Sequence, residues 1–206
     1  MSRSTDRPTR GSGLLETFLS RWRVRKALSL MPDSKAGGRV LDVGCGSNPV
    51  FLSMLRGFEA HGIDKSLSDE MVSASGRRGI FLINHDFSTS GTIPYGSGHF
   101  SVVTMLAVFE HLEHGVLDSV LAETYRVLEP GGVFIMTTPA WWTDPLLRTM
   151  ARVGLVSSEE IDEHVDAYDH KDIFDFLHRA GFQERDIELG WFQLFMNNWG
   201  RAFKRA

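Results

Sequence analysis

The segment Val40-Leu41-Asp42-Val43-Gly44-Cys45-Gly46-Ser47-Asn48-Pro49 decides the fold of this chain. Its apolar run predicts a buried strand over Arg39–Val43, and the residues after the glycines predict a helix over Pro49–Gly57. Gly44 and Gly46 permit positive φ and let a ligand approach the backbone closely. A strand, a glycine-rich turn and a helix in this order are typical of the first unit of a doubly wound α/β sheet.

The same alternation continues along the chain. Further strands are predicted at residues 60–63, 80–84, 100–106 and 133–138, and helices at 14–31, 117–128 and 171–180, the last ended by Gly181. Short apolar runs separated by helices indicate a mostly parallel sheet with helices on both faces. Residues 187–189 and 192–196 flank Gly190-Trp191 at hairpin spacing, which predicts two final antiparallel strands. The predicted fold is therefore α/β and doubly wound, with an additional N-terminal helix.

The chain has 206 residues, which suits one domain rather than two. We expect residues 1–12, rich in Ser, Thr, Arg, Pro and Gly, to be a disordered tail, and residues 13–206 to form a single domain. The connection 139–170 is longer than an ordinary loop and combines Trp141-Trp142 with an acidic stretch. It is predicted either to cover an apolar acceptor or to pack on the core.

Charge and cysteine content indicate the compartment and partners. Net charge is −4, but residues 1–39 carry +6 (nine cations, three acids) and the segment from Trp199 carries +3. We expect these basic ends to be solvated and partly disordered, although Trp199–Arg205 leaves weak peripheral membrane contact open. No basic stripe with interleaved aromatics occurs, so we expect no nucleic-acid partner. The lone cysteine, the absence of an apolar stretch of about 20 residues and the polar N-terminus predict a cytoplasmic protein.

Asp42 and Pro49 separate the possible cofactor classes. Asp42 ends the first strand, where a carboxylate would repel a pyrophosphate and attract a sulfonium or ammonium group. Pro49 replaces the third glycine of the dinucleotide pattern, which argues against a nicotinamide cofactor. A nicotinamide oxidoreductase is therefore a minor alternative.

Two further acidic residues end predicted strands. Asp64 lies twenty residues after Gly44, at the place where a carboxylate accepts hydrogen bonds from ribose hydroxyls. Asp86 follows the third strand and is expected to accept a bond from an adenine amino group, with Phe87 covering the ring. The alternatives are a turn aspartate for Asp64, and a solvated carboxylate beside a core aromatic for Asp86.

These motifs together resemble the class I S-adenosylmethionine-dependent methyltransferases. The resemblance covers residues 39–138 closely, through VLDVGCG, GID, NHDF, FSVVTMLAVFEHL and LEPGGVFIMTTP. It implies that S-adenosylmethionine is the cofactor and that a seventh, antiparallel strand is inserted into the sheet. It places Asp42, Gly44 and Gly46 at the methionine end of the cofactor, Asp64 at the ribose and Asp86 at the adenine. Other residues assigned to the cofactor site are Cys45, Lys65, Phe87, Leu106 and Arg25.

The segment Ala107–Leu112 resembles that of ubiquinone-type O-methyltransferases and small-RNA 2′-O-methyltransferases. Those families can carry Glu-x-x-Glu-His as a metal-binding element, but here Ala107 replaces the first glutamate. Glu110 and His111 alone make a poor metal site, so no metal is predicted. His111 is the candidate general base, because an imidazole with an ordinary pKa of about 6.5 can take a proton from a hydroxyl. Packing against the cofactor is an equally weighted role.

Arg25 lies three residues after Trp22, which predicts a position toward the apolar face of the first helix. There it would meet the cofactor's carboxylate or extend to solvent. The predicted activity is transfer of a methyl group, by direct in-line displacement, to a small acceptor, with apolar molecules among the candidates. The alternative from another class is a module that binds S-adenosylmethionine without catalysis. The sequence identifies neither the acceptor atom nor the oligomeric state.

Overall fold

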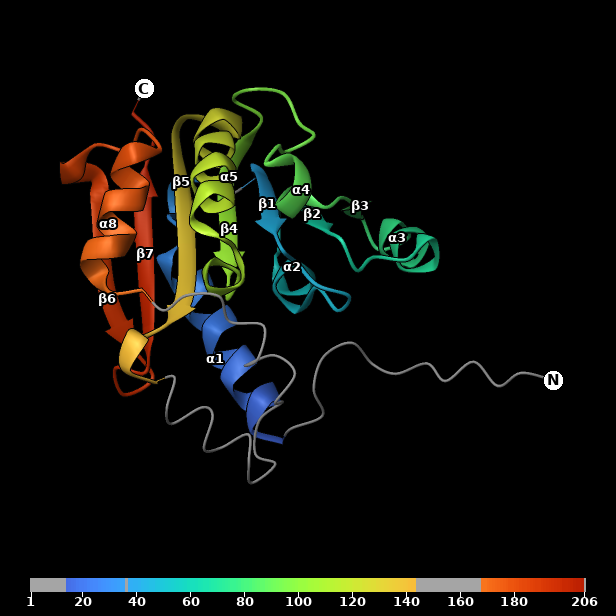
Figure 1. Ribbon diagram of the computed structural model, residues 1–206. Coiled ribbons are helices and arrows are strands. Elements are labelled where there is room, and N and C mark those ends of the chain that lie inside the picture. The colour runs from blue at the N-terminus through green and yellow to red at the C-terminus, as the bar shows by residue number, and fades with distance from the viewer. Residues whose placement is uncertain (1–13, 36, 144–167, 206) are drawn as a thin grey trace.

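A seven-stranded sheet with helices on both faces makes up the computed structural model, which describes residues 14–35, 37–143 and 168–205 (Figure 1). The strands are β1 (Arg39–Val43), β2 (Glu59–Asp64), β3 (Ile80–Asn84), β4 (Phe100–Leu106), β5 (Leu128–Pro139), β6 (Ile187–Phe192) and β7 (Asn197–Phe203). Their order is β3-β2-β1-β4-β5-β7-β6. The first five are parallel, and β7 pairs antiparallel with both β5 and β6. The predicted doubly wound fold and inserted last strand are confirmed.

Each face of the sheet is covered by its own helices and apolar core. The helices are α1 (Leu14–Leu30), α2 (Val50–Met54) and α3 (Asp69–Gly76) on one face, and α4 (Phe87–Ser90), α5 (His114–Val127) and α8 (His170–Arg179) on the other. Adjacent β1 side chains alternate between the two cores: Val40 packs with α1 and α2, and Leu41 with α5 and α8. Figure 1 shows α5 and α8 in front of the sheet.

Local sequence explains where α8 begins and ends. Asp169 accepts a hydrogen bond from the Asp172 amide at 2.8 Å, and the Asp172 side chain accepts one from the Asp169 amide, which completes a capping box. Gly181 follows the helix with φ of 114°, a left-handed conformation that glycine adopts without strain. The predicted helix with its terminal glycine is confirmed.

The predicted hairpin at Gly190-Trp191 is wrong. Both residues lie inside β6, and the turn comes later, at Gln193–Met196. Gly190 pairs with Trp199 of β7, and a Cβ at Gly190 would lie 2.7 Å from the indole ring. This glycine therefore makes room for an aromatic ring within the sheet rather than for a turn.

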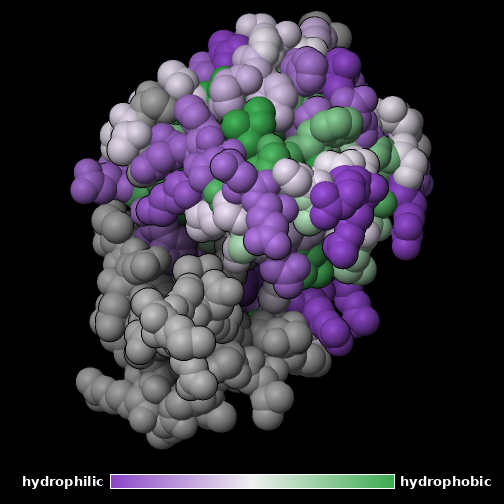
Figure 2. All heavy atoms as spheres, turned by 90° about the vertical axis from the view of Figure 1, so that its right-hand side faces the viewer, coloured by the Kyte–Doolittle hydropathy of each residue, from purple (hydrophilic) through white to green (hydrophobic). Residues whose placement is uncertain are grey.

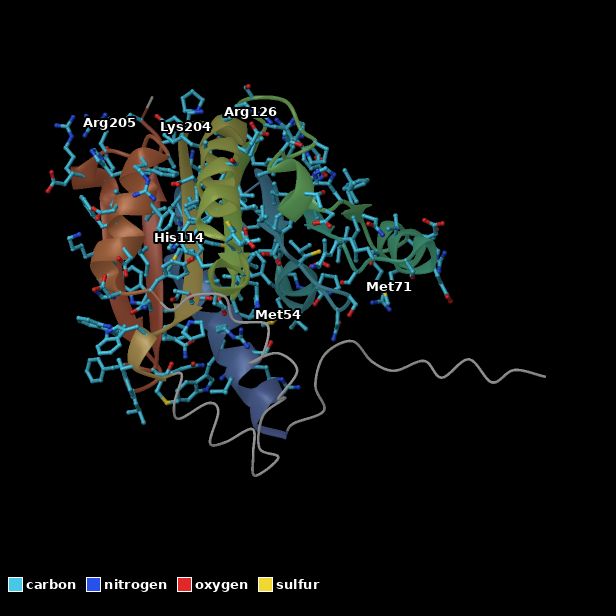
Figure 3. All side chains as sticks on the ribbon, in the orientation of Figure 1. Met54, Met71, His114, Arg126, Lys204 and Arg205 are labelled. Atoms are coloured by element: carbon cyan, nitrogen blue, oxygen red, sulfur yellow. The ribbon has the colours of Figure 1, made fainter. Side chains whose placement is uncertain are left out.

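The basic C-terminal segment is also ordered, against the prediction. Trp199–Phe203 forms most of β7, between β5 and β6. Lys204 donates hydrogen bonds to the carbonyls of Tyr125 and Leu128, each at 2.8 Å, and Arg205 pairs with Asp186 at 2.6 Å. Figure 3 shows Lys204 and Arg205 at the same end of the molecule as Arg126. The positive charge of this segment is thus largely used within the fold.

Some strand and helix limits differ from the predictions. β5 begins at Leu128 rather than 133, because Leu128 pairs with Phe100 before the register shifts. The helices α3 and α4 were not predicted. The expected tail 1–12 and all but the ends of the long connection 139–170 lie outside the described residues, so neither role expected for that connection is tested. Among the described residues, no helix is both long and apolar enough to cross a lipid bilayer.

Candidate functional site

The glycine-rich turn after β1 is held against the end of β2 by backbone hydrogen bonds. The amides of Gly44 and Cys45 both donate to the carbonyl of Ile63, at 2.8 and 3.2 Å. Gly44 and Gly46 have φ of 76° and 66°, as the turn prediction requires. The turn therefore lies at the carboxyl edge of the sheet, where doubly wound folds bind ligands.

Asp64 fixes this turn through its carboxylate. Its Oδ2 accepts from the Gly46 amide at 2.7 Å, and its Oδ1 accepts from the Ser66 amide and hydroxyl at 2.8 and 2.6 Å. A carboxylate offers about four lone-pair sites, and these three bonds leave acceptor capacity for a ligand. The side chain is half-buried at the end of β2. It can hold the turn and accept from a hydroxyl group of a bound molecule at once.

Asp42 is buried and contacts the neighbouring strand. The Thr104 hydroxyl of β4 donates to Asp42 Oδ1 at 2.6 Å, and the two residues are paired in the β1–β4 register. Asp42 is 4% exposed and Thr104 is fully buried. A carboxyl group in such surroundings needs hydrogen bonds, and Thr104 supplies one that also fixes its orientation.

The space beside Gly44 is filled by protein. A Cβ at Gly44 would lie 2.5 Å from Cγ2 of Val108. Val108 follows Ala107, whose φ of 58° is left-handed and unusual for a residue with a side chain. The missing side chain of Gly44 therefore makes room for the loop after β4, and the close approach of a ligand to this backbone stays a prediction.

That loop carries His111. It contains the short helix η2 (Phe109–His111), and the His111 amide donates to the Val108 carbonyl at 3.1 Å. Because Val108 packs on Gly44, the loop that carries the candidate base His111 lies against the glycine-rich turn after β1. Glu110 is buried and accepts from the Thr138 hydroxyl at 3.0 Å, so it joins the loop to β5.

The remaining predicted cofactor residues occupy varied surroundings. Cys45 is buried within the turn, Lys65 is exposed beside Asp64, and Leu106 is half-buried at the end of β4. Asp86 is half-buried after β3, in a segment tied to β2 by the bond from the His85 amide to the Asp64 carbonyl at 3.2 Å. Phe87 packs in the apolar core with α5 and is buried, which matches the core-aromatic alternative.

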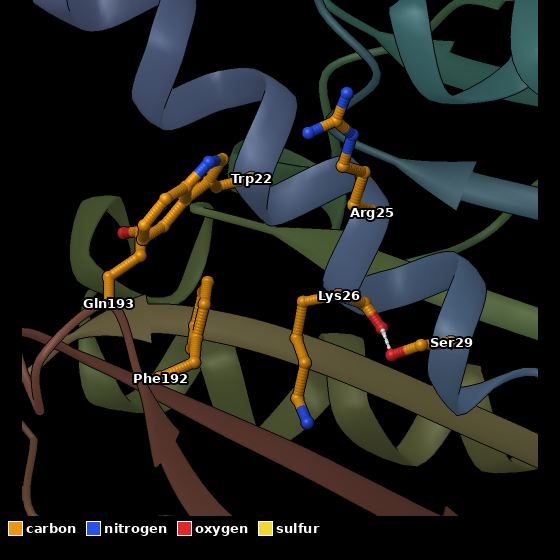
Figure 4. Close-up of a pocket in the computed structure, with 6 residues that line it drawn as sticks. All are labelled: Trp22, Arg25, Lys26, Ser29, Phe192 and Gln193. Atoms are coloured by element: carbon orange, nitrogen blue, oxygen red, sulfur yellow. Dashed lines mark hydrogen bonds between the residues drawn. The ribbon is translucent and has the colours of Figure 1, made fainter.

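Arg25 does not lie on the core face of α1. The buried residues of the described part of that helix are Val24, Ala27 and Leu30, whereas Arg25 is exposed. In Figure 4 its guanidinium points away from Lys26, and both residues line a hollow with Trp22 and Phe192. The predicted position toward the apolar face is wrong, because Trp22, which was used to set that face, is itself 39% exposed, whereas the alternative that Arg25 extends to solvent agrees with its exposure.

Sequence reasoning missed Thr104 and Ser66. A hydroxyl residue within the otherwise apolar run Val102–Leu106 needs a buried partner, and this was a usable signal. The Asp64-Lys65-Ser66 order is compatible with an aspartate turn, in which a carboxylate accepts from the residue two positions on. Both residues hold a predicted carboxylate in place.

The fold and the site together identify the class to which this protein belongs. The sheet is doubly wound and has one inserted antiparallel strand. At the carboxyl edge of the sheet, the glycine-rich turn is held by a hydrogen bond from the Gly46 amide to the Asp64 carboxylate. A family model described as a methyltransferase domain matches residues 15–186 of the chain. The chain belongs to this family and is an enzyme of the class I S-adenosylmethionine-dependent methyltransferases.

Solved structures show the same fold. A methyltransferase from Thermotoga maritima, described as a possible histamine N-methyltransferase, is 16% identical over 93% of this chain and 92% of its own, with a TM-score of 0.68. A protein from Pyrococcus horikoshii OT3 is 19% identical over 97% of both chains, with a TM-score of 0.69. Phosphoethanolamine N-methyltransferase 2 of Haemonchus contortus, solved with S-adenosylmethionine, is 15% identical over 89% of this chain and 52% of its own, with a TM-score of 0.67. No curated protein sequence matches the chain.

Proposed function

We propose that the protein transfers the methyl group of S-adenosylmethionine to a small-molecule acceptor by direct in-line displacement. The observation that carries this proposal is the Asp64 carboxylate, which clasps the glycine turn through Gly46 and keeps acceptor capacity at the carboxyl edge of the sheet. The bound cofactor supplies an electrophilic methyl group on a cationic sulfur. The residues present fit such a molecule, because carboxylates lie at the site and the amides of Gly44–Gly46 already donate to protein oxygens instead of to a pyrophosphate.

Three carboxyl groups support this assignment by their positions. Asp64 is suited to the ribose hydroxyls, and Asp86, after the adjacent strand, to the adenine amino group. Asp42, oriented by Thr104, brings an acidic group to the end of β1, which favours the cationic part of the cofactor. Their order along β1, β2 and β3 follows the extended shape of a nucleoside joined to an amino acid.

The protein needs no covalent nucleophile for this reaction. Holding donor and acceptor in line can remove about 7–11 kcal/mol of the barrier, and a general base adds about 10²–10⁴ in rate. His111 is the proposed base, since its loop packs on the glycine turn through Val108. Its imidazole would take the proton that the acceptor loses. Cys45 is the single cysteine of the sequence, so it cannot form an intramolecular disulfide, which supports a reducing compartment such as the cytoplasm.

The experiment is a transfer assay with methyl-labelled S-adenosylmethionine and a panel of hydroxyl, amine, thiol and carboxylate acceptors. With an acceptor in hand, His111→Ala should lower kcat by about 10²–10⁴ and leave cofactor affinity unchanged. His114→Gln, three residues further on and exposed at the start of α5, is the matched histidine control (Figure 3). Equal loss of cofactor binding and turnover in His111→Ala would overturn the base assignment.

A further inference from the structure

Six exposed apolar side chains gather at one end of the molecule, and we call this surface the aromatic edge. They come from α1, from the short helix η3 (Trp141–Thr143) after β5, and from the end of β6 and the turn into β7: Trp22, Trp141, Trp142, Trp191, Leu194 and Phe195. Backbone contacts tie these segments together. The Ala140 amide donates to the Met196 carbonyl at 2.9 Å, and the Gln193 side chain donates to the Leu19 carbonyl at 3.1 Å. Figure 1 shows η3 beside the β6–β7 turn.

The exposure of tryptophan at this edge is unusual. Four of the five tryptophans in the chain are 39–60% exposed, and all four belong to the aromatic edge. Tryptophan is on average highly buried in folded proteins, and it concentrates at surfaces where one end of the ring is apolar and the other is wet. By contrast, the face around β3 and α3 intersperses its apolar side chains with hydrophilic ones (Figure 2).

The β6–β7 turn presents its apolar side chains despite an unfavourable backbone. Gln193, Leu194 and Phe195 all have positive φ, between 52° and 66°. Glycine or asparagine normally fills such positions, because a Cβ there is strained. Leu194 and Phe195 are nevertheless 85% and 65% exposed, so their side chains gain little from the protein core. The turn therefore holds apolar side chains out into solvent, which points to a partner outside the molecule.

Positive charge flanks the aromatic edge on one side. The sequence of α1, Leu14–Leu30, holds four cations, at positions 21, 23, 25 and 26, and one acidic residue, at position 16. Arg25 and Lys26 line the hollow between α1 and the turn, together with Trp22 and Phe192 (Figure 4). Burial lowers the pKa of Lys26, helped by the positive charge of Arg201. The acidic Asp169 and Asp172 lie on the α8 side of the edge, where they bond to each other's amides.

We propose that the aromatic edge docks on the interface of a lipid bilayer that contains anionic lipid. Exposed tryptophans, protruding Leu194 and Phe195 and a cationic helix are the chemistry that an anionic membrane surface attracts. A second copy of the chain fits less well, because a stable dimer needs a well-packed face of about 1,000 Å² or more, rather than a protruding turn beside four cations. The aromatic edge lies at the carboxyl end of β5, and the glycine-rich turn lies at the carboxyl end of β1. Both are therefore at the same edge of the parallel strands, so docking would bring the cofactor site close to the bilayer. The docking does not depend on methyl transfer.

The experiment measures partitioning of the full chain onto vesicles, by sedimentation and by quenching of tryptophan fluorescence with brominated acyl chains. The vesicles are equimolar phosphatidylcholine and phosphatidylglycerol, or phosphatidylcholine alone. The wild-type protein should bind the anionic vesicles more tightly, lose affinity as salt is raised, and be quenched by the brominated chains. The double substitution Leu194→Ser with Phe195→Ser should weaken partitioning about tenfold or more.

The matched control is Phe81→Ser, a substitution of a 50% exposed aromatic on the edge strand β3, at the other end of the sheet order. It should leave partitioning unchanged. No binding of the wild-type protein, no quenching, or equal loss in Phe81→Ser overturns the proposal. A wild-type dimer in ultracentrifugation that the double variant makes monomeric, without vesicle binding, would assign the edge to a second copy instead. The quenching measurement needs no variant, so it decides the matter even if the double variant fails to fold.

Discussion

Replacing Gly44 with alanine tests how the glycine-rich turn after β1 packs against the loop after β4. The substitution introduces a Cβ at φ of 76°, which costs about 1–2 kcal/mol for a residue other than glycine. The same Cβ would lie 2.5 Å from Val108 Cγ2, so the loop after β4 must move, at about 1–3 kcal/mol. Together these effects should lower the free energy of unfolding by about 2–5 kcal/mol.

Gly57→Ala is the matched control for the backbone effect alone. Gly57 has φ of 73°, and an added Cβ there meets nothing within 4 Å. In urea unfolding, Gly44→Ala should therefore be less stable than Gly57→Ala by about 1–3 kcal/mol, the overpacking contribution. Combining Gly44→Ala with Val108→Ala should recover part of that difference. Equal stability of the two single variants would refute the packing of Val108 on the turn.

Two further predictions concern polar side chains, the buried Thr104 and the half-buried Tyr95. Thr104→Val removes the hydroxyl that donates to Asp42 at 2.6 Å and should lower the free energy of unfolding in urea by about 1–3 kcal/mol. Thr104→Ser keeps the donor and should lower it by less. Equal losses in the two variants would contradict the role of this hydrogen bond. Burial raises the pKa of Tyr95 to about 12, from an ordinary value of 10.0. The unfolded chain therefore loses this proton first, so stability should be full below pH 10 and fall as pH rises from 10 to 12. Tyr95→Phe should reduce the decrease of the urea midpoint between pH 10 and 12, and it should remove the tyrosinate absorbance that appears near pH 12. If the dependence of the urea midpoint on pH is the same in this variant, Tyr95 is not the cause of the decrease.

Much of the fold could be predicted because its signals are local. β1, β3 and β4 have the predicted limits, since buried parallel strands appear as continuous apolar runs between polar turns. Asp64 could be placed at the end of β2 because its spacing from Gly44 is set by one strand–helix–strand unit. These features depend on residues close together in the chain.

What could not be predicted depends on contacts between distant segments. Gly190 has the composition of a turn, and only the ring of Trp199 on the next strand explains its place inside β6. Gly44 likewise has the composition of a ligand-binding glycine, but Val108, far along the chain, occupies the space beside it. Arg25 was placed on the wrong face of α1 because the sequence does not tell that Trp22 stays partly exposed.

The most direct test of the central claim is calorimetric titration of the protein with S-adenosylmethionine and S-adenosylhomocysteine, beside Asp64→Ala. Asp64→Ala removes the acceptor of the Gly46 and Ser66 bonds as well as the proposed ribose contact, so Ser66→Ala, which removes the hydroxyl bond alone, is the matched control. The account predicts that the wild-type protein binds both ligands with micromolar affinity. The affinity should fall by about a hundredfold in Asp64→Ala and stay nearly unchanged in Ser66→Ala. Failure of the folded wild-type protein to bind either ligand would contradict the assignment of this site to S-adenosylmethionine.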